Sequence, residues 1–151
     1  MKTIFKFLGA IFLAVILTIA GVQTFAWYQS SQYEETAVPY LNTAVPEISK
    51  WKTAIVREYM APEAVEKISD EQFAGIIKNF SRLGNLITMD DPEFERLYTG
   101  STAQGGEKKA LKYTIDTVYE NGDAVITVVL LALGDSFQVY KFDINSMALA
   151  K

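Results

Sequence analysis

The sequence predicts an α+β protein, in which an N-terminal transmembrane helix precedes helices packed on a curved antiparallel sheet. Three observations predict this class. An uncharged apolar run opens the chain, apolar residues at helical spacing fill its middle, and alternating apolar and polar residues fill its last third. Because the helical patterns come first and the strand patterns last, the two kinds of element are segregated. Segregation of this kind is typical of α+β architecture.

The first 28 residues predict a membrane anchor. Residues 7–28 contain no charge, Lys2 and Lys6 precede them, and the first acidic residue of the chain is Glu34. A run of about 20 apolar residues spans a bilayer as a helix, and positive charge ahead of it keeps the N-terminus in the cytoplasm. We therefore expect a single-pass protein of the inner (cytoplasmic) membrane whose globular domain is periplasmic or extracellular. The residues expected in the anchor are Phe7, Leu8, Ile11, Phe12, Leu13, Val15, Ile16, Leu17, Ile19, Val22, Trp27 and Tyr28.

A cleaved signal sequence is the alternative for the same segment. Residues 24–26 form a cleavage site of moderate quality, and the apolar run reaches this site without a polar region between. Both alternatives place the rest of the chain on the same side of the membrane. The predicted organisation is an anchor or signal sequence over residues 1–28, a juxtamembrane linker over 29–36 and a globular domain over 37–151.

Composition restricts the classes of function. The 151 residues include no cysteine and no histidine, which excludes a thiol nucleophile, a Cys/His zinc site and a Ser-His-Asp triad. The formal net charge is −4, and no basic stripe interrupts residues 29–151. An acidic domain of this kind argues against nucleic-acid binding. The composition favours a protein that is not an enzyme, and we expect no cofactor.

Prolines divide the first helical region. Proline is tolerated mainly in the first turn of a helix, so Pro39 and Pro46 predict one helix over residues 31–44 and a second that begins near Pro46. Pro62 ends the second helix, and a short helical turn is expected over 62–68. The apolar face of the second helix is expected to comprise Ile48, Trp51, Ile55 and Tyr59.

A further helix is predicted to begin at a capping box. The hydroxyl of Ser69 can accept the backbone N–H of Gln72, whose side chain can reach back to the backbone of Ser69. Gly84 suits the left-handed position that follows a helix. The apolar stripe between these two points comprises Phe73, Ile76, Ile77, Phe80 and Leu83.

A short strand is expected over residues 86–89, followed by an acidic turn over 90–95 and a loop over 100–109. Four carboxylates gather in the turn, and oxygen ligands of this type bind hard cations. Because the turn lacks the glycine and the regular spacing of a calcium loop, we interpret it as solvated and assign no metal ligand.

The rest of the chain predicts an antiparallel meander. Residues 111–119 alternate, and Asn121-Gly122 after them is a strong hairpin signal. Residues 124–133 are apolar on both faces, which suits a central strand that is covered on both sides. Residues 137–144 alternate again and form the last expected strand.

Three segments carry a family resemblance. FSRLGNLI (residues 80–87), YTIDTVYENGDA (113–124) and FQVYKFDINS (137–146) are similar to the helix-to-strand junction, the main hairpin and the last strand of small exported members of the nuclear transport factor 2-like (cystatin-like) superfamily. The resemblance covers roughly residues 36–148. The chain also resembles uncharacterised envelope proteins with a single membrane helix. The resemblance implies a cone-like domain, and it bears on fold much more than on function.

Enzymes of this superfamily, as the resemblance implies, place an Asp or a Tyr inside the cone, where burial disfavours the charged form of an acid. Asp116 shares a strand face with Lys112 and Thr114, which predicts exposure to solvent. Tyr113 and Tyr119 fall on the opposite face, which predicts packing with a hydroxyl available for a hydrogen bond. No catalytic residue is therefore assigned. The candidate residues of a ligand pocket are Tyr113, Tyr119, Tyr140 and Trp51.

Three classes of function remain. The favoured one is a membrane-anchored extracytoplasmic domain that acts in protein–protein contact or assembly without catalysis. Its expected partners are the membrane and either a second copy, bound through the sheet face in a homodimer, or a larger membrane complex. One alternative is a domain that binds a small apolar ligand, or acts as an enzyme, through a pocket inside the cone. The other alternative is an accessory single-span subunit of a larger membrane complex.

Overall fold

The computed structural model describes residues 28, 33–103, 105–134 and 136–150. The predicted membrane segment lies outside these residues, except for Tyr28. Among the described residues, no helix is both long and apolar enough to cross a bilayer. One of the two compact units of the chain is Glu35–Lys151, and the fold described below belongs to it.

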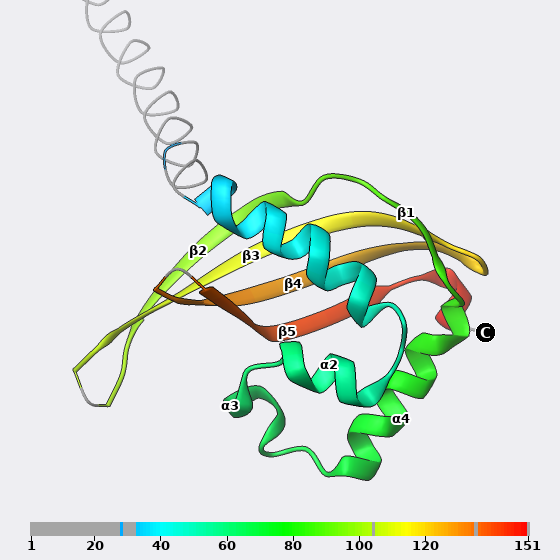
Figure 1. The fold of residues 1–151 in the computed structure, drawn as a ribbon, viewed down its shortest axis with the longest axis horizontal. Coiled ribbons are helices and arrows are strands. Elements are labelled where there is room, and N and C mark those ends of the chain that lie inside the picture. The colour runs from blue at the N-terminus through cyan, green and yellow to red at the C-terminus, as the bar shows by residue number, and fades with distance from the viewer. Residues whose placement is uncertain (1–27, 29–32, 104, 135, 151) are drawn as a thin grey trace, which may run out of the picture. The chain divides into compact units, whose positions relative to one another are not determined.

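Helices come first and strands last in this unit, which confirms the predicted α+β class (Figure 1). Several helices pack against a curved antiparallel sheet of five strands. The elements, in chain order, are a helix over residues 33–48, α2 (Thr53–Tyr59), α3 (Pro62–Val65), α4 (Asp70–Phe80), the 3-10 helix η1 (Ser81–Leu83), β1 (Leu86–Met89), β2 (Glu93–Ser101), β3 (Glu107–Tyr119), β4 (Gly122–Leu133), β5 (Ser136–Asn145) and the 3-10 helix η2 (Met147–Leu149).

The sheet is a meander with two strands at one edge. β4 lies between β3 and β5, and both β1 and β2 pair with β3, all in antiparallel orientation. The turn between β3 and β4 contains Asn121, and Gly122 follows it with φ 155°. The predicted hairpin and the central position of β4 are therefore confirmed.

The structure corrects the predicted acidic turn and loop, because β2 begins at Glu93 and β3 begins at Glu107. The reason is a register shift in β2 between Phe94 and Arg96. Phe94 pairs with Tyr113, and Leu97 pairs with Leu111. The two inward residues of β3 are therefore two positions apart, whereas their partners on β2 are three positions apart. A bulge of this kind adds one residue to the strand. The added residue interrupts the alternation of apolar and polar residues, and this alternation is the pattern by which a strand is recognised in a sequence.

The predicted break at Pro46 is wrong, because the first helix continues over residues 33–48. Pro39 and Pro46 leave the carbonyls of Glu35 and Asn42 without an intrahelical donor. Both of these residues are exposed, so water can satisfy their carbonyls. Burial of an apolar stripe against the sheet outweighs the loss of two hydrogen bonds. The stripe comprises Ala37, Leu41, Ala44, Val45 and Ile48.

Trp51 lies between two helices rather than on the apolar face of one. Its φ is 56°, in the left-handed region that residues with a side chain seldom adopt, and α2 begins only at Thr53. The indole Nε1 donates to the carbonyl of Gly84 at 2.8 Å. Its ring lies 6.1 Å from that of Phe80 and 5.7 Å from that of Tyr119, between centroids. These contacts hold the backbone in an uncommon conformation.

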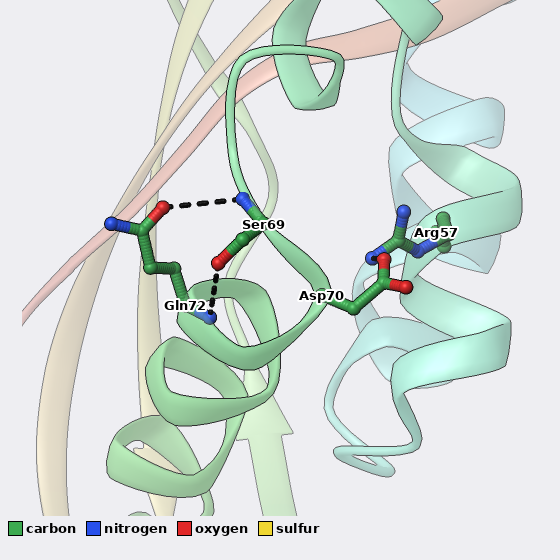
Figure 2. Close-up of polar contacts among 4 residues, drawn as sticks. All are labelled: Arg57, Ser69, Asp70 and Gln72. Carbon is green, nitrogen blue, oxygen red and sulfur yellow. Dashed lines mark hydrogen bonds and ion pairs between the residues drawn. The ribbon is translucent and has the colours of Figure 1, made fainter.

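The start of α4 confirms the predicted capping box (Figure 2). Ser69 Oγ accepts the backbone N–H of Gln72 at 3.2 Å, and Gln72 Oε1 accepts the backbone N–H of Ser69 at 3.1 Å. Arg57 on α2 donates to Asp70 at 2.9 Å and so joins α2 to α4. At the other end, after η1, Gly84 has the predicted positive φ, 79°, but its ψ of −157° lies outside the left-handed helical region.

The core lies between the helices and one face of the sheet, which we call the inner face. Asp116 is exposed on the opposite face of β3, which confirms the predicted alternation. Tyr119 reaches the end of the first helical segment through a hydrogen bond with Ser49. The buried inner-face residues of the two longest strands are Leu111, Tyr113, Ile115, Thr117 and Tyr119 on β3, and Ala124, Ile126, Val128 and Leu130 on β4.

Candidate functional site

The opposite face of the sheet, which we call the outer face, is the candidate site. Strand pairing brings residues from four strands together on it, because successive side chains along a strand point to opposite faces. Its members include Glu93 and Arg96 on β2, Lys112, Thr114, Asp116 and Val118 on β3, Asp123, Val125, Thr127, Val129, Leu131 and Leu133 on β4, and Gln138, Lys141, Asp143 and Asn145 on β5.

An apolar strip runs along the middle of the outer face. Val125 and Leu133 on β4 are 41% and 47% exposed, and Val118 on β3 is 38% exposed. The prediction that β4 is covered on both sides therefore holds for its inner face, and on the outer face it holds for Leu131, which is 8% exposed. Exposed apolar residues gathered on one surface mark an interaction site more often than isolated ones do.

Charged residues on the outer face are separated into two adjacent rows. The acidic row runs across the sheet from Glu93 through Thr114 and Thr127 to Asp143. The basic row, one step further along the strands, runs from Arg96 through Lys112 and Val129 to Lys141.

Further carboxylates lie on the acidic side of these rows. Asp116 and Asp123, with Asp90, line a groove of about 500 Å³. Among the described residues, no group of three or more carboxylates is arranged to hold a metal ion. The outer face is therefore divided into an acidic end and a basic band, with the apolar strip crossing both.

One ion pair lies within the basic row. Lys112 Nζ lies 2.7 Å from Glu95 Oε2, and the hydrogen bond to this carboxylate raises the pKa of Lys112. Both side chains are partly exposed, so the pair contributes little to stability. It fixes the direction of the Lys112 side chain more than it strengthens the fold.

The structure separates the four predicted pocket residues. Trp51 and Tyr119 pack against each other, while Tyr113 packs against Phe94 with ring centroids 5.6 Å apart. Tyr140 lies where the pairing of β4 with β5 shifts register, and it is 46% exposed. The outer face and its groove are lined by other residues. The ligand-pocket role of the four residues stays a prediction.

The hydroxyl of Tyr119 belongs to a buried polar contact. It lies 2.8 Å from Ser49 Oγ, and both residues are at most 3% exposed. Burial raises the pKa of Tyr119, although hydrogen bonds with Ser49 and Thr117 act in the opposite direction. A neutral phenol that solvent does not reach positions the helical layer on the sheet.

The aromatic cluster around Tyr40, at the middle of the first helix, is also structural. The ring of Tyr40 lies 5.6 Å from that of Phe137 and 6.3 Å from that of Tyr59. Burial, followed by the neighbouring Tyr59, raises the pKa of Tyr40 to about 12. Tyr40 is therefore uncharged at neutral pH and packs as an aromatic residue.

Comparison with known proteins assigns no family to the chain. No protein-family model matches the sequence, and no curated protein matches it. The resemblance to the nuclear transport factor 2-like superfamily stays a prediction that rests on residues 36–148. The function must therefore be inferred from the outer face itself.

Proposed function

We propose that this chain is a membrane-anchored protein-contact module, and that the outer face of its sheet binds a second copy of the chain. The observation that carries the proposal is the arrangement of the outer face, in which an apolar strip crosses adjacent acidic and basic rows. An isologous dimer needs one surface patch that is complementary to itself. Two adjacent rows of opposite charge meet this condition.

The charge rows select one geometry for the dimer. In this geometry the two-fold axis lies between the two sheets. It runs perpendicular to the strands, between the acidic row and the basic row. Each strand is then antiparallel to the same strand of the second copy. Asp143 then faces Lys141 of the second copy. On β4, Val125 faces Leu131 of the second copy, whereas Leu133 faces Asp123 of the second copy. Sheets that pack face to face keep their strands within about 30° of each other, which this arrangement satisfies.

The other simple two-fold arrangement is disfavoured. An axis along the strands would place the acidic row against the acidic row and the basic row against the basic row. Like charges that meet across an interface are unfavourable and suppress wrong pairings. Charge therefore fixes the register of the two copies, and burial of the apolar strip supplies the driving force.

The predicted anchor supports the same function. Residues 7–28 would hold two copies in one membrane plane, ahead of the helix that covers residues 33–48. Tethering of this kind raises the effective concentration of one binding surface near another. A weak contact between outer faces would then be sufficient for dimer formation.

Light scattering on the full chain in detergent tests the proposal. We expect a dimer for the natural sequence and a monomer for Val125→Lys, because the variant places an ammonium group at one end of the apolar strip, opposite Leu131 of the second copy. Ile76→Lys is the matched control, since Ile76 on α4 is 42% exposed and Val125 is 41% exposed. This control is expected to remain dimeric.

Two results would contradict the proposal. One is a strictly monomeric natural chain at high protein concentration. The other is a Val125→Lys variant that dimerises as well as the control. If the chain purifies from membranes as a single copy bound to other proteins, it acts as an accessory subunit of a larger complex instead.

A further inference from the structure

A small apolar cavity lies on the helical side of the domain, away from the outer face. Its volume is about 180 Å³; it is bounded by α2, α3, α4, the end of the first helix and β5, and it is partly open to solvent. The lining residues are Ile48, Val56, Met60, Val65, Ile68, Phe73, Ile76, Ile77, Phe80, Lys141 and Phe142. Lys141 is the charged member, and its strand register assigns its side chain to the outer face.

The cavity adjoins an open groove on α4. Ile68, Ile76 and Phe80 line both the cavity and the groove, so the two spaces share one apolar wall. The polar side chains of the groove are the amides of Gln72 and Asn79, which carry no charge. Gly75 also lines the groove, and a Cβ atom added there would meet no atom within 4 Å. A molecule seated in the cavity can therefore extend one end toward two amide groups.

The size of the cavity indicates what it can hold. Protein interiors are packed as densely as organic crystals, so a space of this size beneath a helix is unusual. Apolar cavities stay free of water and accept apolar molecules, and one of about 150 Å³ in another protein holds benzene. A cavity of 180 Å³ is large enough for a ring or a chain of about six carbon atoms.

We infer that this cavity binds the hydrocarbon part of a small uncharged amphiphile, with the polar end of that molecule at Gln72 and Asn79. Apart from Lys141, the lining is apolar and disfavours a charged group, because a charge moved out of water needs a partner of opposite sign. The amide oxygens of Gln72 and Asn79 already accept from the backbone N–H of Ser69 and from Arg82. Their amide N–H groups can donate to the oxygen of an alcohol, an amide or an ester. The site shares Lys141 with the proposed dimer contact, and the rest of its walls come from the helices, their connections and Phe142 on β5.

Fluorescence quenching of Trp51 tests the inference in the full chain. The ring of Trp51 lies 6.1 Å from that of Phe80, which lines the cavity, between centroids. The chain contains two tryptophans, so Trp27→Phe leaves Trp51 as the single reporter. The probe is 4-iodobenzyl alcohol, an iodinated ring with an uncharged polar end. We expect quenching that saturates with probe concentration.

Two controls separate binding from partition into detergent. Val65→Phe places a larger side chain in the cavity, and Val38→Phe makes the same change at a half-buried position on the first helix that does not line it. Saturable quenching should be lost in Val65→Phe and kept in Val38→Phe. The anionic probe 4-iodobenzoate should quench without saturation.

The inference fails if quenching by 4-iodobenzyl alcohol increases linearly with probe concentration in the chain that keeps Val65. It also fails if quenching saturates equally in Val65→Phe. Saturation by 4-iodobenzoate at the same concentration would overturn the assignment to an uncharged ligand. Thermal unfolding provides a second measurement, because a ligand that binds the folded state raises the midpoint of unfolding. We expect that shift for the natural cavity and its loss in Val65→Phe, provided that Val65→Phe itself unfolds cooperatively.

Discussion

The hydroxyl groups of Ser49 and Tyr119 lie 2.8 Å apart and form a buried hydrogen bond between the turn after the first helix and strand β3. Trp51, two residues further along, packs against the ring of the same tyrosine in a tilted arrangement. Together they fix the helical layer on the inner face of the sheet. The outer face, on the opposite side, is left for a partner.

The buried hydrogen bond between Ser49 and Tyr119 predicts that substitutions at these two residues have non-additive effects on the free energy of unfolding. Tyr119→Phe leaves the hydroxyl of Ser49 without this partner, and Ser49→Ala does the same to Tyr119, so each is expected to cost about 1–3 kcal/mol of unfolding free energy. The double variant should cost less than the sum of the two. Denaturant unfolding of the full chain in detergent measures all three. Tyr98→Phe, at a tyrosine that is 44% exposed, is the control and should change little; strict additivity of the two changes would contradict the coupling.

Two glycines predict opposite effects of the same substitution. Gly84 has φ 79°, and an added Cβ would lie 2.6 Å from Glu120 Oε2. Gly84→Ala should therefore destabilise the domain by about 1–3 kcal/mol. Gly75→Ala, inside α4 with open space around it, should stabilise the domain by about 0.5–1 kcal/mol. Thermal unfolding compares the two variants, and a Gly84→Ala variant as stable as the natural chain would show that the backbone at Gly84 is not constrained.

The hydrogen bonds of Glu120 predict that the folded domain loses part of its stability at low pH. Its carboxylate accepts hydrogen bonds from the backbone N–H of Asn85 at 2.9 Å and from the Asn85 side chain at 3.1 Å, which lower the pKa of Glu120 below its usual value of 4.5. The folded state therefore favours the charged form. The resulting stability is present above pH 4.5 and is lost as the pH falls through the lowered pKa.

Glu120→Gln tests this dependence on pH. The variant retains an acceptor oxygen but cannot titrate, so its unfolding free energy should fall less steeply than that of the natural chain below pH 4.5. Unfolding measured at a series of pH values gives the two slopes. Identical slopes would show that Asn85 does not stabilise the charged form.

The orientation of the chain in the membrane gives a further prediction. Lys2 and Lys6 precede the apolar run and are expected to keep the N-terminus in the cytoplasm. Lys2→Glu combined with Lys6→Glu should reduce export of a reporter fused after residue 151. The activity of an export-dependent reporter measures this effect. Export at full yield in the double variant would show that these charges do not set the orientation.

The order and type of most elements could be predicted from local sequence. The capping box at Ser69 and Gln72 and the hairpin at Asn121-Gly122 each lie within a few neighbouring residues. The continuity of the first helix could not be predicted in this way, because the burial of its apolar stripe outweighs the local effect of Pro46. β2 was missed because its bulge places Phe94 and Leu97 three residues apart.

The candidate site was less predictable than the fold. The apolar composition of β4 on both faces did indicate a surface that needs covering. The charge rows depend on pairing between segments that are distant in the sequence. In the acidic row, Glu93 pairs with Thr114, and Thr114 pairs with Thr127. Thr127 in turn pairs with Asp143. No local pattern places such residues in one row. The apolar cavity likewise collects residues from five elements and their connections.

The central claim is that opposite charge rows join two outer faces, and a charge exchange within β5 tests it most directly. Lys141→Glu and Asp143→Lys should each place like charges in contact across the proposed interface and shift the full chain in detergent toward monomer, as measured by light scattering. The double variant Lys141→Glu/Asp143→Lys reverses both charges in both copies, so it should restore the dimer. A double variant that is as monomeric as the single variants, or single variants that dimerise like the natural chain, would contradict the account.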